Sequence, residues 1–130
     1  MNQESATVLI IDDEPGVSSV LTLILNRAGF KARVAADGKA GLAIASAEVP
    51  SLILCDERMP VLDGYATLRQ LKANPATSEI PVIMMGGTNE EGLCDWRKQG
   101  ADRFVLKPFD SVKLLAAVRE LVKREATPAA

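Results

Sequence analysis

Residues 8–16 read VLIIDDEPG, and this short stretch sets the direction of the whole fold. Four branched apolar residues lead directly into Asp12, Asp13 and Glu14, so a segment that favours burial ends on three consecutive carboxylates. Ionised carboxylates repel one another and resist removal from water. A strand that ends in this way therefore predicts a positively charged group close to its carboxyl end.

The alternation of short apolar runs with amphipathic stretches continues along the chain. The apolar runs predict strands over residues 7–11, 31–36, 51–55, 80–85 and 102–106. The intervening stretches predict helices over residues 17–29, 38–48, 64–74, 89–100 and 111–125. In the first helix, one face collects the apolar side chains, which are Val17, Val20, Leu21, Ile24 and Leu25. Strands that are apolar throughout, alternating with helices, predict one α/β domain, a parallel five-stranded sheet doubly wound by helices on both faces.

Composition excludes several classes of function. The 130 residues carry a net charge of −2 and no histidine, which leaves no basic field for nucleic acid and no histidine for a catalytic triad or a metal site. Cys55 and Cys94 are too few for a disulfide framework, so both are expected to be reduced, packed thiols. No apolar run approaches the roughly 20 residues that cross a bilayer, so we expect a cytoplasmic protein without a membrane contact.

Charged side chains follow three of the predicted strands at the end where open α/β sheets bind their ligands. Asp12 and Asp13 follow the first strand, Asp56 the third and Lys107 the fifth. Carboxylates with water and phosphate oxygens suit Mg²⁺, and a carboxylate beside Mg²⁺ and a lysine is placed to attack a phosphoryl group. Each residue alone has a simpler role, in a helix cap, a turn or a solvated surface. Only the set predicts a site.

On these stretches the chain resembles the CheY-like receiver domains of two-component response regulators. The stretches VLIIDDEPG, LILCDERMPVLDG, IPVIMM and GADRFVLKPF carry the resemblance, together with the closing helix, and they cover nearly the whole chain. The resemblance implies a flavodoxin-like sheet with strand order 2-1-3-4-5. It also implies a receiver domain over residues 1–124, followed at residues 125–130 by a disordered tail or the start of a linker.

The resemblance assigns a role to each charged residue. Asp56 is expected to be the phosphoacceptor and Lys107 the residue that contacts the phosphoryl group. Mg²⁺ is expected to bind Asp12, Asp13 and Asp56, with the backbone carbonyl of Arg58 completing its protein ligands.

The chain departs from the family pattern at the end of the fourth strand. The family has Ser or Thr there, where this chain has Gly86 followed by Gly87, so the usual hydroxyl is missing. Thr88 is better placed to cap the next helix than to replace that hydroxyl. Phe104 falls at the family's aromatic switch position, with half-buried packing on a strand as the alternative. The resemblance also implies a cis Lys107–Pro108 bond.

These features predict a stand-alone receiver that is not an enzyme. A sensor histidine kinase or phosphotransfer protein would phosphorylate Asp56 with Mg²⁺, and a protein partner would read the change on residues 89–100, 102–106 and 111–125. Gly86 makes the switch atypical. One alternative is an interaction module that works without phosphorylation, which Gly86 favours. Another is a Mg²⁺-dependent hydrolase, which generally needs a second acid where this chain has Arg58.

Overall fold

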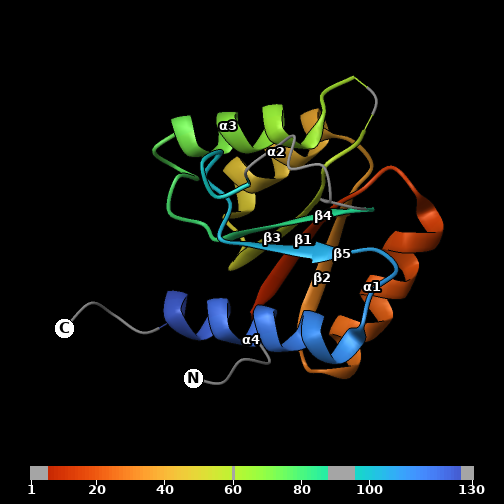
Figure 1. Cartoon of the computed structure of the whole chain (residues 1–130). Coiled ribbons are helices and arrows are strands. Elements are labelled where there is room, and N and C mark those ends of the chain that lie inside the picture. The colour runs from red at the N-terminus through yellow and green to blue at the C-terminus, as the bar shows by residue number, and fades with distance from the viewer. Residues whose placement is uncertain (1–5, 60, 88–95, 127–130) are drawn as a thin grey trace.

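The computed structural model describes residues 6–59, 61–87 and 96–126 of the chain. Strands and helices alternate through most of it (Figure 1). The elements are β1 (Thr7–Ile11), α1 (Pro15–Arg27), β2 (Lys31–Ala35), α2 (Gly38–Glu48), β3 (Leu52–Asp56), α3 (Gly64–Ala73), β4 (Val82–Gly86), β5 (Arg103–Leu106) and α4 (Ser111–Ala126).

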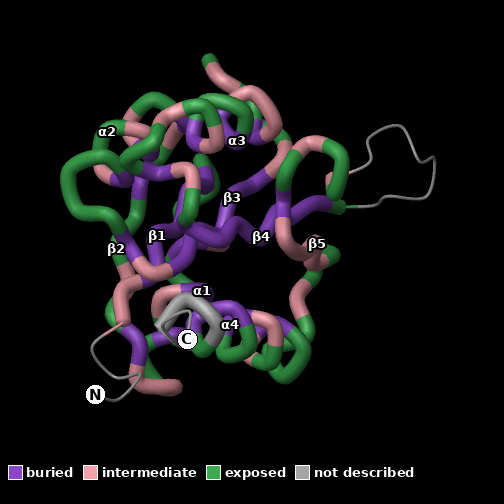
Figure 2. Tube along the Cα trace, turned by 90° about the vertical axis from the view of Figure 1, so that its left-hand side faces the viewer, coloured by how far each residue is buried: buried purple, intermediate pink, exposed green. Residues whose placement is uncertain are grey.

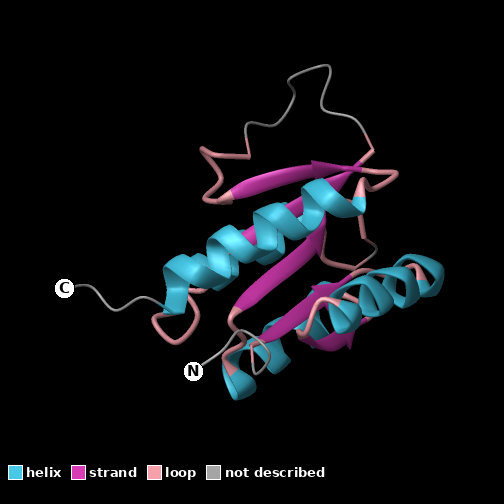
Figure 3. Cartoon of the chain, turned by 90° about the horizontal axis from the view of Figure 1, so that it is seen from below, coloured by secondary structure: helices cyan, strands magenta, loops and turns pink. Residues whose placement is uncertain are grey.

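The five strands form one parallel sheet in the order β2-β1-β3-β4-β5, which confirms the predicted fold class and strand order. Helices α2 and α3 cover one face, and α1 and α4 cover the other (Figure 1). Seen from below in Figure 3, α4 crosses in front of the sheet and leads to the C-terminus. Because every strand runs the same way, the carboxyl ends of all five lie along one edge of the sheet, here called the C-terminal edge.

The three central strands are the most buried part of the molecule (Figure 2). Every residue of β3 and β4 is buried, whereas the edge strands β2 and β5 are largely exposed or half-buried. A central strand packs against helices on both of its faces, so it cannot alternate apolar and polar residues. This explains why the central strands are continuous apolar runs in the sequence.

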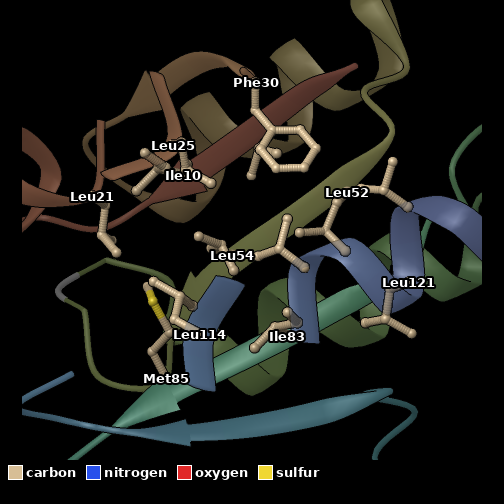
Figure 4. Packing of buried hydrophobic residues seen from close by; sticks show 13 residues of the cluster. Ile10, Leu21, Leu25, Phe30, Leu52, Leu54, Ile83, Met85, Leu114 and Leu121 are labelled. Carbon is tan, nitrogen blue, oxygen red and sulfur yellow. The ribbon is translucent and has the colours of Figure 1, made fainter. Parts of the chain in front are cut away.

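Two hydrophobic clusters lie on the two faces of the sheet. The first cluster packs α1 and α4 against residues such as Ile10, Leu54 and Ile83, with Leu114 from α4 reaching the sheet (Figure 4). The second cluster packs α2 and α3 against the other face through residues such as Leu68. Both clusters are built mainly from Leu, Ile, Val, Ala and Met side chains. The sheet is thereby packed on both faces, and it carries the residues at its C-terminal edge.

The helix boundaries follow local side-chain chemistry. Asp37 accepts a hydrogen bond from the Ala40 N–H at 2.8 Å and starts α2, and Asp63 accepts one from the Ala66 N–H at 2.9 Å and starts α3. Aspartate at this position satisfies a backbone N–H that has no partner inside the helix. None of the described helices is long and apolar enough to cross a membrane.

The structure corrects the prediction for α1 in two ways. The helix begins at Pro15 rather than Val17, because proline has no N–H to satisfy in the first turn. Leu21 and Leu25 are buried as predicted, but Val20 is 51% exposed and does not belong to the buried face. Only part of the apolar face of α1 is covered by the rest of the protein, and Val20, at the border of that face, stays in contact with water.

The helix predicted over residues 89–100 is not found in its described part. Residues 89–95 lie outside the described residues, and residues 96–100 form turns. Gly100 has a φ of 106°, its N–H bonds to the Arg97 carbonyl, and the Ala101 N–H bonds to the Trp96 carbonyl. A glycine with positive φ and this pair of bonds close the C-terminal end of a helical segment. The bonds of Gly100 and Ala101 thus have the pattern of a helix C-terminus, but the described residues before them are turns.

Candidate phosphoryl and metal site at the C-terminal edge

The sheet register brings the predicted charged residues together. Ile11 of β1 is paired with Cys55 of β3, so Asp12 lies level with Asp56 at the C-terminal edge. Lys107 follows β5 directly, and its backbone N–H donates a 2.7 Å hydrogen bond to the Gly86 carbonyl at the end of β4. Three segments distant in the sequence thus converge at one place. We call Asp12, Asp13, Asp56 and Lys107 the acid pocket.

Lys107 is the positive group that the first strand end requires. Its Nζ atom lies 3.1 Å from Asp12 Oδ2, 3.3 Å from Asp56 Oδ1 and 3.5 Å from Glu14 Oε1. Asp12 and Asp56 are buried, so their charges are poorly screened and need this partner. The Lys107–Pro108 bond is cis, as predicted.

Three carboxylates of the acid pocket are arranged as a metal site would need them. One oxygen each from Asp12, Asp13 and Asp56 lies within 4.8 Å of the others, and Asp13 is exposed while the other two are buried. All the donors are hard oxygens, which fits Mg²⁺ in chemistry. Asp12 also has the simpler role considered for it, since its Oδ1 accepts a 2.9 Å hydrogen bond from the Glu14 N–H. One oxygen of Asp12 therefore shapes the loop, and the other faces Lys107.

The electrostatics of the pocket reflect crowded negative charge. Burial raises the pKa of Asp56, and repulsion by Asp12 adds to the rise, while Lys107 and the Arg58 N–H partly offset it. For Lys107, burial lowers the pKa, but the hydrogen bond to Asp12 and the charges of Asp56 and Asp12 outweigh it and leave that pKa raised. The lysine is therefore held firmly in its charged form. The carboxylates still carry an excess of negative charge that a bound cation would relieve.

For the remaining predicted site residues, the structure gives a position but does not test the predicted role, or does not describe the residue. Arg58 lines the pocket and its N–H lies 3.5 Å from Asp56 Oδ1, whereas the role expected for its carbonyl stays a prediction. Phe104 on β5 is half-buried and packs against the second cluster, and its role in a switch stays a prediction. Thr88 lies outside the described residues. Cys55 is a free, buried thiol whose pKa is strongly raised by burial, as expected for a packed side chain, and Cys94 lies outside the described residues.

Two acidic residues were missed by sequence reasoning. A cavity of about 250 Å³ beside the acid pocket is lined by Glu14, Asp56, Glu57, Arg58, Gly86, Gly87 and Lys107. Glu14 contributes a third carboxylate to Lys107, and the Glu57 side chain lies against Gly86. For Glu14, the run of three carboxylates had predicted a positive group nearby. For Glu57, the sequence holds one indication, which is a glycine at position 86 where the family has a larger residue. It does not say which side chain occupies the vacated space.

The β3–α3 connection holds Asp56 in place by close backbone packing. Gly64 opens α3 and donates a 3.1 Å hydrogen bond to the Glu57 carbonyl. A Cβ atom at Gly64 would lie 2.1 Å from the Asp56 carbonyl oxygen, which is fixed in the sheet. Only glycine permits this approach, so the first turn of α3 sits directly against the backbone of Asp56.

A doubly wound parallel sheet with paired aspartates, a further aspartate and a lysine at its C-terminal edge defines a receiver-type signalling domain. The sequence matches the response regulator receiver domain family over residues 8–119. The chain belongs to this family, whose members act in two-component signalling with histidine kinases or phosphotransfer proteins. Receiver domains are signalling domains that typically bind Mg²⁺ at an aspartate cluster.

Two curated relatives illustrate the range of the family. The chain is 36% identical over 118 residues to the DNA-binding dual master transcriptional regulator RpaA of Synechocystis, covering 90% of this chain and 49% of that protein. It is also 36% identical over 118 residues to Protein PilH of Pseudomonas aeruginosa, covering 90% of this chain and 98% of PilH. The chain spans about half the length of RpaA and 26% of the response regulator PleD of Caulobacter vibrioides.

Solved structures agree with the observed fold. The Francisella response regulator 1452 receiver domain has a TM-score of 0.85 at 29% identity, covering 92% of this chain and 98% of that one. The Vibrio cholerae chemotaxis protein CheY4 has a TM-score of 0.80 at 26% identity, covering 89% of this chain and 98% of that one.

Proposed function

We propose that this receiver domain accepts a phosphoryl group on Asp56 in a Mg²⁺-dependent step and relays the event as a change in affinity for a protein partner. The observation that carries the proposal is the position of Lys107, whose Nζ lies 3.1 Å from Asp12 and 3.3 Å from Asp56. One ammonium group shared by two buried carboxylates leaves negative charge that a divalent cation would balance. The same ammonium group is placed to pair with a phosphoryl group on Asp56.

The chemistry follows from these contacts. A carboxylate oxygen of Asp56 attacks the phosphorus of a phosphohistidine on the donor, and an O–P bond forms as the P–N bond breaks. The electron pair of the broken bond returns to the imidazole of the donor. The Lys107 ammonium pairs with an oxygen of the transferred group and offsets its charge. None of these 130 residues is a histidine, so the phosphohistidine lies outside them, and we propose that a sensor histidine kinase or a phosphotransfer protein carries it.

Asp12, Asp13 and Asp56, with the Arg58 carbonyl, are the groups we propose to hold Mg²⁺. The cation would neutralise charge on the phosphoryl oxygens during transfer. Asp13 is the exposed member of the set, which leaves the site open for a donor to approach. Asp12 keeps its hydrogen bond to the Glu14 N–H in this role, so the loop that carries Asp13 stays in shape.

The output surface that we propose comprises residues 89–100, β5 and α4. Leu106 at the end of β5 is 53% exposed and Val112 in the first turn of α4 is 75% exposed, and apolar side chains in water favour contact with a protein partner. We place the switch at Gly86, Thr88 and Phe104. Because Gly86 offers no hydroxyl to the phosphoryl group, the switch differs from the usual one of the family. The relay is expected to operate in the cytoplasm.

Labelling with a small phosphodonor tests the proposal. The purified protein is treated with acetyl phosphate and Mg²⁺, and its intact mass is measured. We expect one added phosphoryl group per chain, which is lost when Asp56→Asn is used or when EDTA removes the metal. Absence of labelling in the folded wild-type protein would leave the phosphorylation-independent interaction module, the candidate that Gly86 favours.

A further inference from the structure

The Glu57 side chain occupies the space that a side chain at Gly86 would need. A Cβ atom built on Gly86 would lie 2.1 Å from Glu57 Oε1, 2.5 Å from Glu57 Cδ and 3.0 Å from Glu57 Cγ. Among the described glycines, only Gly29 and Gly100 have positive φ angles, so the backbone at Gly86 does not itself demand glycine. The Glu57 carboxylate thus occupies the volume that the family gives to a serine or threonine side chain.

The same carboxylate is linked to helix α3. The Tyr65 hydroxyl, from the first turn of α3, donates a 3.3 Å hydrogen bond to Glu57 Oε2. Tyr65 is half-buried and packs against the second cluster, so its ring is held by the core on the α2–α3 face. Glu57 therefore joins the end of β4 to α3 through one side chain. Its own backbone is anchored, since its N–H donates a 2.8 Å hydrogen bond to the Met85 carbonyl.

The charges in the cavity make this position of Glu57 dependent on the state of Asp56. Glu57 lines the cavity with Asp56 and Lys107, and Lys107 already serves Asp12, Asp56 and Glu14. A phosphoryl group on Asp56 adds negative charge to a space already lined by the carboxylates of Glu14, Asp56 and Glu57. Of the two cationic residues described there, Arg58 and Lys107, Lys107 is already shared among three carboxylates. Glu57 is able to move away from Gly86, because its carboxylate is the end of a flexible side chain, whereas its neighbours at Gly86 and Met85 are backbone.

We propose that Glu57 is a movable positioning residue, seated over Gly86 before phosphorylation and expelled from that seat by the phosphoryl group on Asp56. This inference rests on the proposed phosphorylation of Asp56. Expulsion breaks the hydrogen bond from Tyr65, so the event is reported to α3. The glutamate and the glycine together replace the hydroxyl that the family uses. The sequence pair Glu57 and Gly86 functions as one unit, since a side chain at Gly86 and a seated Glu57 exclude each other.

Tyr65 supplies a site-specific probe because it is the chain's one tyrosine. Protein labelled with 3-fluorotyrosine gives a single ¹⁹F signal from the chain, and bound beryllofluoride, a phosphoryl mimic, gives separate ¹⁹F signals of its own. We expect the Tyr65 signal of the wild-type protein to move when beryllofluoride binds in the presence of Mg²⁺. In Glu57→Ala there is no carboxylate to lie over Gly86, and in Gly86→Ala the added methyl group blocks that position. Their signals should start near the shifted position and move little further.

Glu57→Gln separates charge from shape. The amide fits the seat and accepts the hydrogen bond from Tyr65, but it is not repelled by the phosphoryl mimic. The Tyr65 shift should therefore be largely lost while beryllofluoride still binds, and labelling by acetyl phosphate should become several-fold faster. Glu79→Gln is the matched control, because Glu79 is exposed and does not line the cavity, and it should respond as the wild type does.

The outcomes distinguish the two proposals. Bound beryllofluoride signals with an unmoved Tyr65 signal in the wild type would overturn the role of Glu57 and leave phosphorylation of Asp56 intact. An unchanged response in Glu57→Gln would overturn it as well, because the repulsion would then not be the cause. Absence of bound beryllofluoride in the folded protein would overturn both proposals.

Discussion

Replacing Lys107 by methionine isolates the contribution of the one cation in the described acid pocket. The two side chains are similar in length, so Lys107→Met removes the charge and largely keeps the volume. In the wild type, the Lys107 side chain is 18% exposed and contacts Asp12 and Asp56, whose side chains are 0% and 7% exposed. The substitution leaves these carboxylates desolvated and without a cationic partner.

The expected loss of stability follows from the burial of the pair. Removing one partner of a fully buried ion pair costs roughly 3–5 kcal/mol. Lys107 is partly exposed and Asp56 can take up a proton, so we expect a smaller loss, about 2 kcal/mol at about pH 7 without divalent cations. For a chain of this size, that corresponds to a decrease in Tm of about 7 °C.

The loss should also depend on pH with a definite sign. Lys107 lowers the pKa of Asp56, so removing it raises further a pKa that burial already raises. A carboxyl group whose pKa is raised in the folded state stabilises the fold below its unfolded pKa, and that stability is lost as the pH rises through the folded value. The difference between wild type and Lys107→Met should therefore grow from about pH 4 to about pH 7.

Urea unfolding of both proteins at the two pH values, with EDTA present, measures this directly. Lys39→Met on the exposed face of α2 controls for the loss of a lysine charge as such. Added Mg²⁺ should recover more stability in Lys107→Met than in the wild type, because the metal then supplies the missing positive charge. A loss below about 0.5 kcal/mol at neutral pH, or an equal loss at both pH values, would refute the reasoning.

Three further changes test the site and the core. Asp56→Asn should stabilise the metal-free protein by about 1 kcal/mol near neutral pH, because the pKa of the Asp56 carboxyl group is raised by burial and by Asp12. This gain in stability should vanish in acid, and unfolding followed by fluorescence at both pH values measures it. Gly64→Ala should destabilise by about 3 kcal/mol in urea, since its Cβ would meet the Asp56 carbonyl oxygen at 2.1 Å. Leu54→Ala, fully buried in the first cluster, should lower the free energy of unfolding by about 3 kcal/mol, measured by calorimetry.

Much of the fold was predictable because its determinants are local. The central strands are continuous apolar runs, and their burial on both faces requires that pattern. Asp37 and Asp63 start α2 and α3 through hydrogen bonds to N–H groups three residues ahead, which a sequence pattern can indicate. The predicted start of α1 and the predicted burial of Val20 were wrong. Both depend on which parts of the fold pack against α1, and the local sequence does not encode that.

By itself, the sequence determined which residues would stand at the strand ends. Apolar runs that stop at Asp12, Asp56 and Lys107 place these residues at the C-terminal edge of any parallel sheet. Their distances to one another required the register of β1, β3 and β5, which is set by packing across the whole sheet.

The tertiary structure alone decided what fills the space at Gly86. A missing side chain is visible in the sequence, but the Glu57 carboxylate reaches that space from the neighbouring strand end, and Tyr65 approaches it from α3. Contacts between segments far apart in the chain depend on the directions of side chains within the folded sheet, and no local preference encodes those directions. The charges of the site are therefore a property of the sequence, whereas the position of Glu57 among them is a property of the fold.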